Sequence, residues 1–575
     1  MQRRQLPLFG LLLLLIVFLG SALLYPIWLT LRGGFEDSSG AFTLIHIRSI
    51  FDDPLLRQGL VHALAIALGT TVMSMVIALP LAILSARYRF PLARALGALV
   101  LVPMILPPFV GAIGIQHLLG RSGALNALLL NLGVISDRID FLGAGGMWAI
   151  MAIEALALYP IIYLNATAAL ANLDPALDEA AENVGAGPWR RLFQITLPLI
   201  RPGLFAGGTI VFIWSFTELG TPLLLDYQVV TPVQIFGGLK EMNASAQPYA
   251  LTALMLALSV SIYVVGRSIF GRRAHAMYAK ASIQAQPVPL RGVPAYLATG
   301  YALGVFAIAV LPHLCVILAS LATPGSWYES ILPQSFTLGH YESALSHPMA
   351  VGAIRNSLLL ALAAMALDLI IGLCVGYLVV RTTLPLRGVL DALTMLPLAV
   401  PGLVMAFGYV AMTLHSPFGK DGPLSGFADI LGAEPNPFPL LILAYAVRRL
   451  PYVVRATVAG LQQTSGELEE AALNLGASRF TAARTIIVPL ISANLIAGGL
   501  MAFSFAMLEV SDSIILAQRA EHFPITKAIF VLFDRLGDGR AIASAMGVWG
   551  MAILTVTLLS ASLAMGKRMG ALFRV

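Results

Sequence analysis

A polar segment that occurs twice places the strongest constraint on this chain. Residues 173–203, which begin LDPALDEAAENVG, match residues 464–494, which begin TSGELEEAALNLG, at an offset of 291 residues. The two copies share Glu179/Glu470, Ala180/Ala471, Ala181/Ala472, Gly185/Gly476 and Pro198/Pro489, and the same offset relates Glu218 to Glu509. The chain is therefore an internal duplication, and we expect its two halves to have the same fold.

Each copy begins with a helix start signal. Asp174 is a good N-cap acceptor, and Pro175 follows it at the first helical position, where a missing N–H costs nothing. In the second copy, Thr464 and Glu467 have the spacing of a capping box. Both patterns predict a short polar helix that carries a carboxylate near its start.

Glycine and proline residues mark the expected helix ends in the rest of the repeated segment. Gly185 and Gly476 can take a positive φ, so we expect each to end the first helix and to turn the chain into a second one. Pro198 and Pro489 are expected to stop that second helix just before the apolar sequence resumes. Each copy is then a helix, a glycine turn and a helix, which is a shape suited to docking.

The sequence around these segments is too apolar for a soluble protein. Hydrophobic residues make up 58% of the chain and charged residues 11%, whereas soluble domains carry about 25% charged residues. A membrane span needs roughly 20 apolar residues. Twelve runs qualify, six in each half: 8–31, 60–86, 95–118, 146–170, 203–225, 248–270, 296–322, 355–380, 389–413, 437–461, 493–517 and 542–565. The predicted fold is an all-α integral membrane protein of about twelve helices.

The basic residues predict the topology. With both termini in the cytoplasm, most Lys and Arg fall on the inner side, as the positive-inside rule requires, and so do both repeated segments. Six spans place a basic linker, 271–295, inside, between a first half at 1–270 and a second half at 296–575. Two parallel halves imply a pseudo-two-fold axis along the membrane normal, where a pathway is expected.

The third span of each half contains prolines. Pro103 and Pro107 in LVPMILPPFVGAIG correspond to Pro397 and Pro401 in TMLPLAVPGLVMAFG, at an offset of 294 residues. A proline breaks the hydrogen-bond ladder of a span and is tolerated where neighbours or a cavity satisfy the released carbonyls. These helices either line the pathway, with Pro107 and Pro401 at its edge, or are kinked for packing alone.

Carboxylates inside the spans are candidates for the cargo path, since a charge at the centre of a bilayer costs at least about 2.5–3.5 kcal/mol. Glu218 and Glu509 follow matched Gly-Gly pairs that permit close helix approach. They flank the outer gate or the path, or they lie at the outer interface, hydrated or paired with an outer-loop Arg. Glu154 and Asp368 are weaker candidates.

No catalytic constellation is present in the sequence. It has no G-x-x-x-x-G-K-[ST], H-E-x-x-H or G-x-S-x-G motif, and its nine histidines are dispersed. The two cysteines, Cys315 and Cys374, lie in apolar runs and are predicted to be packing residues. We expect no metal site and no cofactor on this chain. The basic residues form no aromatic-studded stripe, which argues against nucleic-acid binding.

The repeated motif resembles the signature loop of permease subunits of binding-protein-dependent ABC importers: E-A-A, a glycine five residues later, then I and L-P or V-P. Two copies in one chain, with six spans each, resemble the fused permeases of the ferric-iron importer family, whose relatives include thiamine and 2-aminoethylphosphonate permeases. LPPFVGAIG at 106–114 and LLGRSGALN at 118–126 favour the ferric-iron branch.

This resemblance implies a type I ABC importer permease fold in the bacterial cytoplasmic membrane, in contact with lipid. It implies two copies of a cytoplasmic ATPase subunit, which bind ATP and Mg²⁺, and a periplasmic or lipid-anchored solute-binding protein. Each loop would insert into a groove on one ATPase, with Glu179 and Glu470 pairing with basic groups and Gly185 and Gly476 permitting the turn. ATP-driven closure of the ATPase would then move the two halves.

Other functions stay open from the residues alone. The cargo is ferric iron by the resemblance, with 2-aminoethylphosphonate, thiamine or another small organic solute as alternatives. An ion-coupled secondary transporter can also have twelve spans, but it has no use for duplicated docking helices. A membrane-embedded enzyme would need an acid/base or metal cluster, and an unpartnered amphipathic hairpin would leave the matched Glu, Gly and Pro unexplained.

Overall fold

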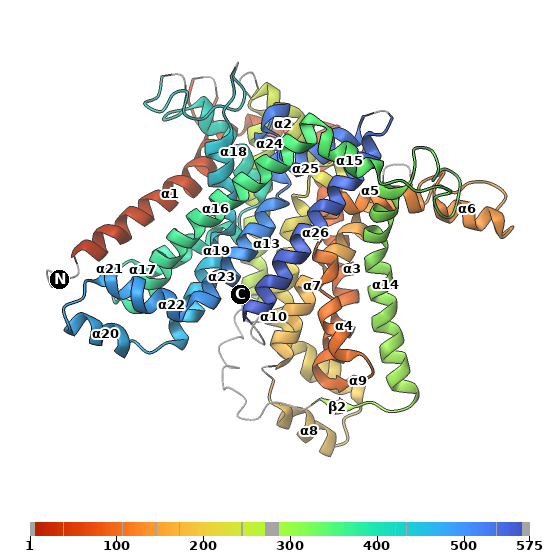
Figure 1. Cartoon of the computed structure of the whole chain (residues 1–575), viewed down its shortest axis with the longest axis horizontal. Helices are drawn as coiled ribbons and strands as arrows, with labels where there is room; N and C mark the ends of the chain where they lie inside the picture. Colours follow the sequence, from red (N-terminus) through yellow and green to blue (C-terminus); the bar gives the residue numbers. More distant parts are fainter. Residues whose placement is uncertain are drawn as a thin grey trace.

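The protein is a bundle of long helices lying side by side, with shorter helices at both ends (Figure 1). The computed structural model describes residues 6–565 except 38, 106, 144–145, 172, 243–244, 271–286, 420, 433 and 536. The predicted all-α class is confirmed. The described residues form one two-stranded sheet, in which β1 (Tyr88–Arg89) pairs in parallel with β2 (Val288–Pro289).

The two halves have the same order of long helices. The first half contains α1 (Leu6–Phe35), α3 (Pro54–Arg87), α4 (Ala93–Leu99), η2 (Val102–Ile105), α5 (Pro108–Leu119), α7 (Met147–Ala171), α10 (Leu197–Phe216) and α13 (Gln247–Phe270). The second contains α14 (Val293–Leu321), α16 (Pro348–Arg381), α17 (Arg387–Met395), η6 (Leu396–Leu398), α18 (Gly402–Leu414), α19 (Phe438–Gln463), α23 (Ser492–Met507) and α26 (Gly539–Met565).

Shorter elements lie between these helices. At one end of the bundle are the pieces of the repeated segments: α8 (Pro175–Asn183), α9 (Pro188–Arg191), η3 (Leu192–Thr196), α20 (Glu467–Asn474), α21 (Arg479–Ala482), η7 (Ala483–Ile487) and α22 (Val488–Leu490). The remaining short helices are α2 (Ile45–Asp52), α6 (Ala124–Asn131), α11 (Gly220–Leu224), α12 (Thr231–Gly237), η4 (Gly238–Glu241), α15 (Gly339–Ser346), α24 (Ser511–Leu516), η8 (Ala520–His522) and α25 (Ile525–Phe533).

The described residues contain eight helices that are long and apolar enough to cross a membrane, or eleven if each of three bent pairs is one span. All eleven overlap predicted runs, although the two that contain the end of a repeated segment begin and end earlier than predicted. The twelfth, predicted at 437–461, is helix α19, which is absent from that set and is less apolar because it carries Arg448, Arg449 and Arg455. Helix α19 packs against α16 and α23 inside the bundle, so its charges have protein neighbours.

The prolines break the third span of each half as expected. In the first half the chain bends by 94° between residues 104 and 108, and in the second by 104° between 398 and 402. Pro107 and Pro401 each occupy the position just before the helix that follows the bend, α5 or α18. Neither proline therefore has to supply a hydrogen bond inside a helix.

The first helix of each half packs mainly on the other half. Helix α1 lies against α18, α16 and α17, and helix α14 lies against α5, α4 and η2 (Figure 1). Two glycines make these contacts close. A Cβ on Gly408 would lie 2.7 Å from the Pro26 carbonyl oxygen, and one on Gly114 would lie 2.4 Å from that of Pro312. The halves are therefore interlocked through matched proline–glycine contacts.

A tyrosine completes the first of these contacts. Pro26 has no N–H, which leaves the carbonyl of Ala22, four residues earlier, without its helical donor. The Tyr409 hydroxyl, on α18, donates to this carbonyl at 3.1 Å. A side chain of the second half thus satisfies the backbone of the first span, as a membrane interior requires.

The predicted Gly-Gly contacts are present. A Cβ on Gly207 of α10 would lie 3.0 Å from the Ile162 Cα on α7, and one on Gly498 of α23 would lie 2.8 Å from the Ala456 Cβ on α19. These glycines bring α10 and α23 close to the fourth span of their own half. The helices that directly precede Glu218 and Glu509 are positioned in this way.

The described end of the predicted linker lies at the end of the bundle where the repeated segments lie (Figure 1). Residues 271–286 of the predicted linker 271–295 are outside the described residues. Strand β2, at its described end, pairs with the loop that follows α3, and Leu290 N–H donates to the Arg89 carbonyl at 2.8 Å. The described ends of α1 and α26 at Leu6 and Met565 lie toward this same end (Figure 1).

Candidate functional site

The two repeated segments, here called the docking hairpins (residues 173–203 and 464–494), project from the same end of the bundle (Figure 1). Helix α8 begins as predicted: the Asp174 side chain accepts from Ala176 N–H at 3.0 Å, and Pro175 is at the first position. Gly185 and Gly476 have φ of +81° and +89°. The predicted glycine turn is therefore present in both hairpins.

The predicted docking residues lie on the outer surface of these turns. Glu179, Ala180, Glu470 and Ala471 are exposed, and Ala181 and Ala472 are half-buried. Neither glutamate forms an ion pair within the described part of the chain. Their carboxylates are therefore available to a second protein.

Two details of the hairpins differ from the expectation. Thr464 and Glu467 form no capping box: the N-cap of α20 is Gly466, and Ser465 Oγ accepts from Glu467 N–H at 3.2 Å. The Thr464 hydroxyl instead accepts from Arg381 at 2.9 Å. An arginine at the end of α16 therefore binds the group that the capping box would use.

Pro198 also does not end a helix. The chain is helical from Pro188 to Phe216, because a π-helical turn at Leu192–Thr196 precedes the proline and accommodates a residue that lacks an N–H. In the second hairpin the equivalent π turn, Ala483–Ile487, precedes Pro489, and the helix ends at Leu490 with a bend of 79°. The two hairpins therefore join their membrane helices differently.

Each hairpin is fixed to the long helix of its own half by an arginine. Arg87, in the last turn of α3, lies 3.6 Å from the Asp178 carboxylate. Arg381, in the last turn of α16, lies 3.8 Å from Glu469, which also accepts from the Tyr377 hydroxyl at 2.6 Å. The duplication matches Arg87 to Arg381 and Asp178 to Glu469. The carboxylate beside each exposed glutamate is thus used internally.

Exposed apolar side chains surround the exposed glutamates, and the sequence reasoning missed them. Val184 and Leu475, directly before the two turn glycines, are 84% and 90% exposed. The same offset relates two further exposed pairs, Leu177/Leu468 and Trp189/Phe480. Their match between the copies was the available signal. Three apolar side chains at equivalent exposed positions on each hairpin form a surface suited to a protein partner.

A second site is a cavity of about 190 Å³ between the two halves, here called the central cavity. Its lining includes four of the five predicted pathway residues, Pro107, Glu154, Glu218 and Glu509. The fifth, Pro401, does not line it, although its neighbour Gly402 and Pro397 do. Asp368 is buried outside the lining. The broken third spans therefore border this cavity in both halves.

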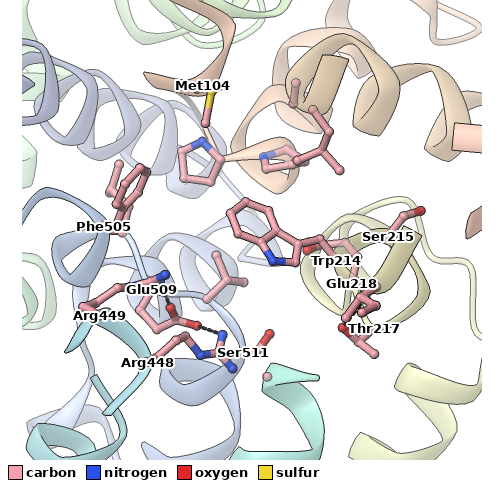
Figure 2. Close-up of a pocket in the computed structure, with 18 of the residues that line it drawn as sticks. Met104, Trp214, Ser215, Thr217, Glu218, Arg448, Arg449, Phe505, Glu509 and Ser511 are labelled. Atoms are coloured by element: carbon pink, nitrogen blue, oxygen red, sulfur yellow. Dashed lines mark hydrogen bonds and ion pairs between the residues drawn. The ribbon is translucent and has the colours of Figure 1, made fainter. Parts of the chain in front are cut away.

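In the second half, the cavity carboxylate is held by arginines (Figure 2). Arg448 Nη1 lies 2.7 Å from Glu509 Oε1, and Arg449 donates to Glu509 Oε2. Asp512 lies 3.4 Å from Arg448. Glu509 is 3% exposed, so the alternative of a hydrated or outer-loop-paired carboxylate is wrong for it. Consecutive arginines in an apolar run were the signal for this partner.

In the first half, the cavity carboxylates are held only by hydroxyl and amide groups. Glu218 accepts from Thr221 N–H at 3.2 Å. Glu154 Oε2 accepts from Thr70 Oγ1 at 3.2 Å and from Ser215. Neither glutamate has an ion pair within the described ranges. No group of three or more His, Cys, Asp or Glu suited to a metal ion occurs there either.

The chain resembles iron transport permeases along most of its length. It is 28% identical over 428 residues to the ferric transport system permease protein FbpB 1 of Haemophilus influenzae, covering 72% of this chain and 63% of that protein. It is 26% identical over 458 residues to FbpB of Actinobacillus pleuropneumoniae, covering 78% of this chain and 62% of that one. The chain thus spans less than two thirds of these relatives' length.

Among solved structures, an ABC transporter involved in the import of the polysaccharide alginate is similar with 20% identity and a TM-score of 0.37, over 47% of this chain and 97% of that one. The family described as binding-protein-dependent transport system inner membrane component matches twice, at residues 78–275 and 368–565. Each match contains one docking hairpin and one half of the central cavity. The chain is a fused, two-half member of the binding-protein-dependent transport system inner membrane component family.

Proposed function

We propose that this chain is the permease of an ATP-driven importer that carries ferric iron across the inner membrane. The observation that carries the proposal is the matched pair of docking hairpins. Each presents an exposed glutamate, a glycine turn and three exposed apolar side chains at equivalent positions. Two equivalent surfaces suit two copies of one partner, which we take to be an ATPase that binds ATP and Mg²⁺.

The internal ion pairs support a lever role for the hairpins. Arg87 and Arg381 connect them to α3 and α16, the long helices of their own halves. Movement of an ATPase against Glu179 and Glu470 is thus transmitted to helices that border the other half. On this proposal the hairpins, the described end of α1 and the end of α26 all face the cytoplasm, and an external binding protein delivers cargo at the opposite end.

Two observations support iron as the cargo. The relatives FbpB 1 and FbpB are named for ferric transport. The central cavity is lined by three carboxylates and two guanidinium groups, with Asp512 beside them. An excess of carboxylates favours a cation over an anion such as 2-aminoethylphosphonate.

Reconstitution tests the proposal. The chain is placed in liposomes with its ATPase and its binding protein, and uptake of radiolabelled ferric iron is measured with and without ATP. We expect ATP-dependent uptake that is lost when Glu179→Lys and Glu470→Lys are combined. Co-purification of the ATPase should be lost in the same double variant and kept in Glu342→Lys, an exposed site on α15 at the other end of the bundle.

Two outcomes would contradict it. Uptake that survives the double charge reversal would remove the docking role. ATP-dependent uptake of 2-aminoethylphosphonate or thiamine, with none of iron, would keep the importer and replace its cargo.

A further inference from the structure

The two sides of the central cavity carry unequal charge at positions related by the duplication. At the offset of 291 residues, Ala157 and Leu158 on α7 correspond to Arg448 and Arg449 on α19, and all four line the cavity. The carboxylates Glu218 and Glu509 are matched as well. The second half therefore supplies its own cations to its glutamate, and the first half does not.

The arginines engage both carboxylate oxygens of Glu509. Its two carboxylate oxygens are each bound by a guanidinium group, and Arg448 also contacts Asp512. Glu509, Asp512 and Arg449 are buried and Arg448 is partly buried, so their interaction is only weakly screened by salt. A cation that enters the cavity meets a side already occupied by positive charge.

The first half presents the opposite situation. Glu154 is 1% exposed, and its Oε1 has no hydrogen-bond partner among the described residues. A buried carboxylate oxygen without a partner is costly unless a ligand satisfies it. Ser215, which donates to Glu154, is in the last turn of α10, and Glu218 lies two residues beyond the end of that helix. Both glutamates are among the residues that line the central cavity. Glu154 and Glu218 thus reach the cavity together.

We propose that Glu154 and Glu218 form a one-sided transit site for a hard, multivalent metal cation, with Arg448 and Arg449 excluding that cation from the second half. The proposal rests on the proposed function and specifies where the transported cation binds transiently inside the permease. Carboxylate oxygens are the ligands that hard cations prefer. Two carboxylates without a third are suited to passage rather than storage, because conduction requires that a bound ion also leaves.

Terbium luminescence tests the site without the ATPase. Tb³⁺ is a hard trivalent cation, and its emission is sensitised by a nearby tryptophan. Trp214 lines the central cavity (Figure 2). In the full chain in detergent, we expect saturable emission on tryptophan excitation, and we expect ferric citrate to displace it. Trp214→Phe, which copies Phe505 of the second half, should remove the emission and keep the competition measured by equilibrium dialysis.

The variants assign the site to the first half. We expect Glu154→Gln and Glu218→Gln each to weaken Tb³⁺ binding by at least about tenfold. Ala157→Arg, which gives the first half the arginine of the second, should abolish it. Glu342→Gln, at an exposed carboxylate outside the cavity, should leave binding unchanged, and size-exclusion profiles identify any variant that misfolds.

Three results would overturn the site. Absence of saturable Tb³⁺ binding would mean that Glu154 is simply protonated. Binding that survives both glutamine variants would place the ion elsewhere. Binding lost in Glu342→Gln would mark surface adsorption. If ATP-dependent ferric uptake persists in the wild type in any of these cases, the transit site alone fails, and loss of wild-type iron uptake refutes the proposed function instead.

Discussion

The two halves of the molecule are most alike where they leave the membrane and least alike where they meet inside it. Both docking hairpins keep an arginine–carboxylate anchor, a left-handed glycine and three exposed apolar positions. In the cavity, the positions occupied by Arg448 and Arg449 in the second half are occupied by Ala157 and Leu158 in the first half. We infer that two identical partner subunits require two equivalent docking hairpins. A single cargo path between the halves does not require the two sides of the central cavity to be equivalent.

The largest difference between the halves should appear in stability. Glu509→Gln removes a carboxylate from two buried guanidinium groups, and we expect a loss of about 3–5 kcal/mol in the free energy of unfolding. Glu218→Gln breaks no ion pair and should cost about 1 kcal/mol or less. Denaturation by SDS in mixed micelles measures both. Equal losses would mean that the asymmetry of charge has no energetic consequence.

Charge reversal on the hairpins probes the symmetrical part of the comparison. Glu179→Lys and Glu470→Lys should each weaken binding of the ATPase by about 2 kcal/mol or more, because a like charge replaces a pairing group. Both residues are exposed, so the fold should be unaffected. Co-purification at increasing ionic strength ranks the two variants. Weaker ATPase binding in only one of the two variants would show that the two hairpins do not contribute equally to docking.

The two arginine–carboxylate anchors should differ modestly in how much they stabilise their hairpins. Glu469 is 7% exposed and binds Tyr377 as well as Arg381, so Glu469→Gln should cost about 1–2 kcal/mol of local stability. The Asp178 side chain is 30% exposed, and Asp178→Asn should cost about 0.5 kcal/mol. Hydrogen exchange in α20 and α8 reports each loss. If Asp178→Asn accelerated exchange in α8 more than Glu469→Gln accelerated it in α20, the expected order would be wrong.

The smallest effect concerns the exposed aromatic side chains. Trp189→Ala and Phe480→Ala should change stability by less than about 0.5 kcal/mol, because both rings face outward. ATPase affinity should fall for both, since exposed aromatic rings are typical interface anchors. Isothermal titration in nanodiscs compares the two. Unchanged affinity in both variants would remove these rings from the docking surface.

The sequence was sufficient for elements whose cause is local. Hydrophobic run length predicted twelve spans, and eleven of them overlap helices or bent helix pairs that are long and apolar enough to cross a membrane. Asp174 with Pro175 predicted the start of α8, and Gly185 and Gly476 predicted left-handed turns. The offset of the duplication placed Glu218 and Glu509 at equivalent sites. Each of these inferences depends on a few neighbouring residues or on a fixed register.

What depends on contacts between distant segments was not predictable. Arg381 binds the Thr464 hydroxyl, 83 positions away, which the expected capping box would have used. A π turn lets the helix continue through Pro198, whereas the helix of the second hairpin ends at Leu490, next to Pro489. Arg448 and Arg449 lie in a predicted span, but only the fold shows that they bind Glu509, 61 and 60 residues away. The docking prediction for Glu179 and Glu470 stays a prediction until a partner is present.

The interlocking of α1 with α18 dictates an order of events during biosynthesis. Helix α1 ends at Phe35 and its partner α18 ends at Leu414, so at a synthesis rate of about 5–20 residues per second the first span waits roughly 20–75 s for the helix it packs on. During that interval the Ala22 carbonyl lacks the Tyr409 hydroxyl. Helix α13 of the first half can pack on α1 earlier, but lipid or an insertion factor must cover the α18-facing side of α1 until α18 has been synthesised.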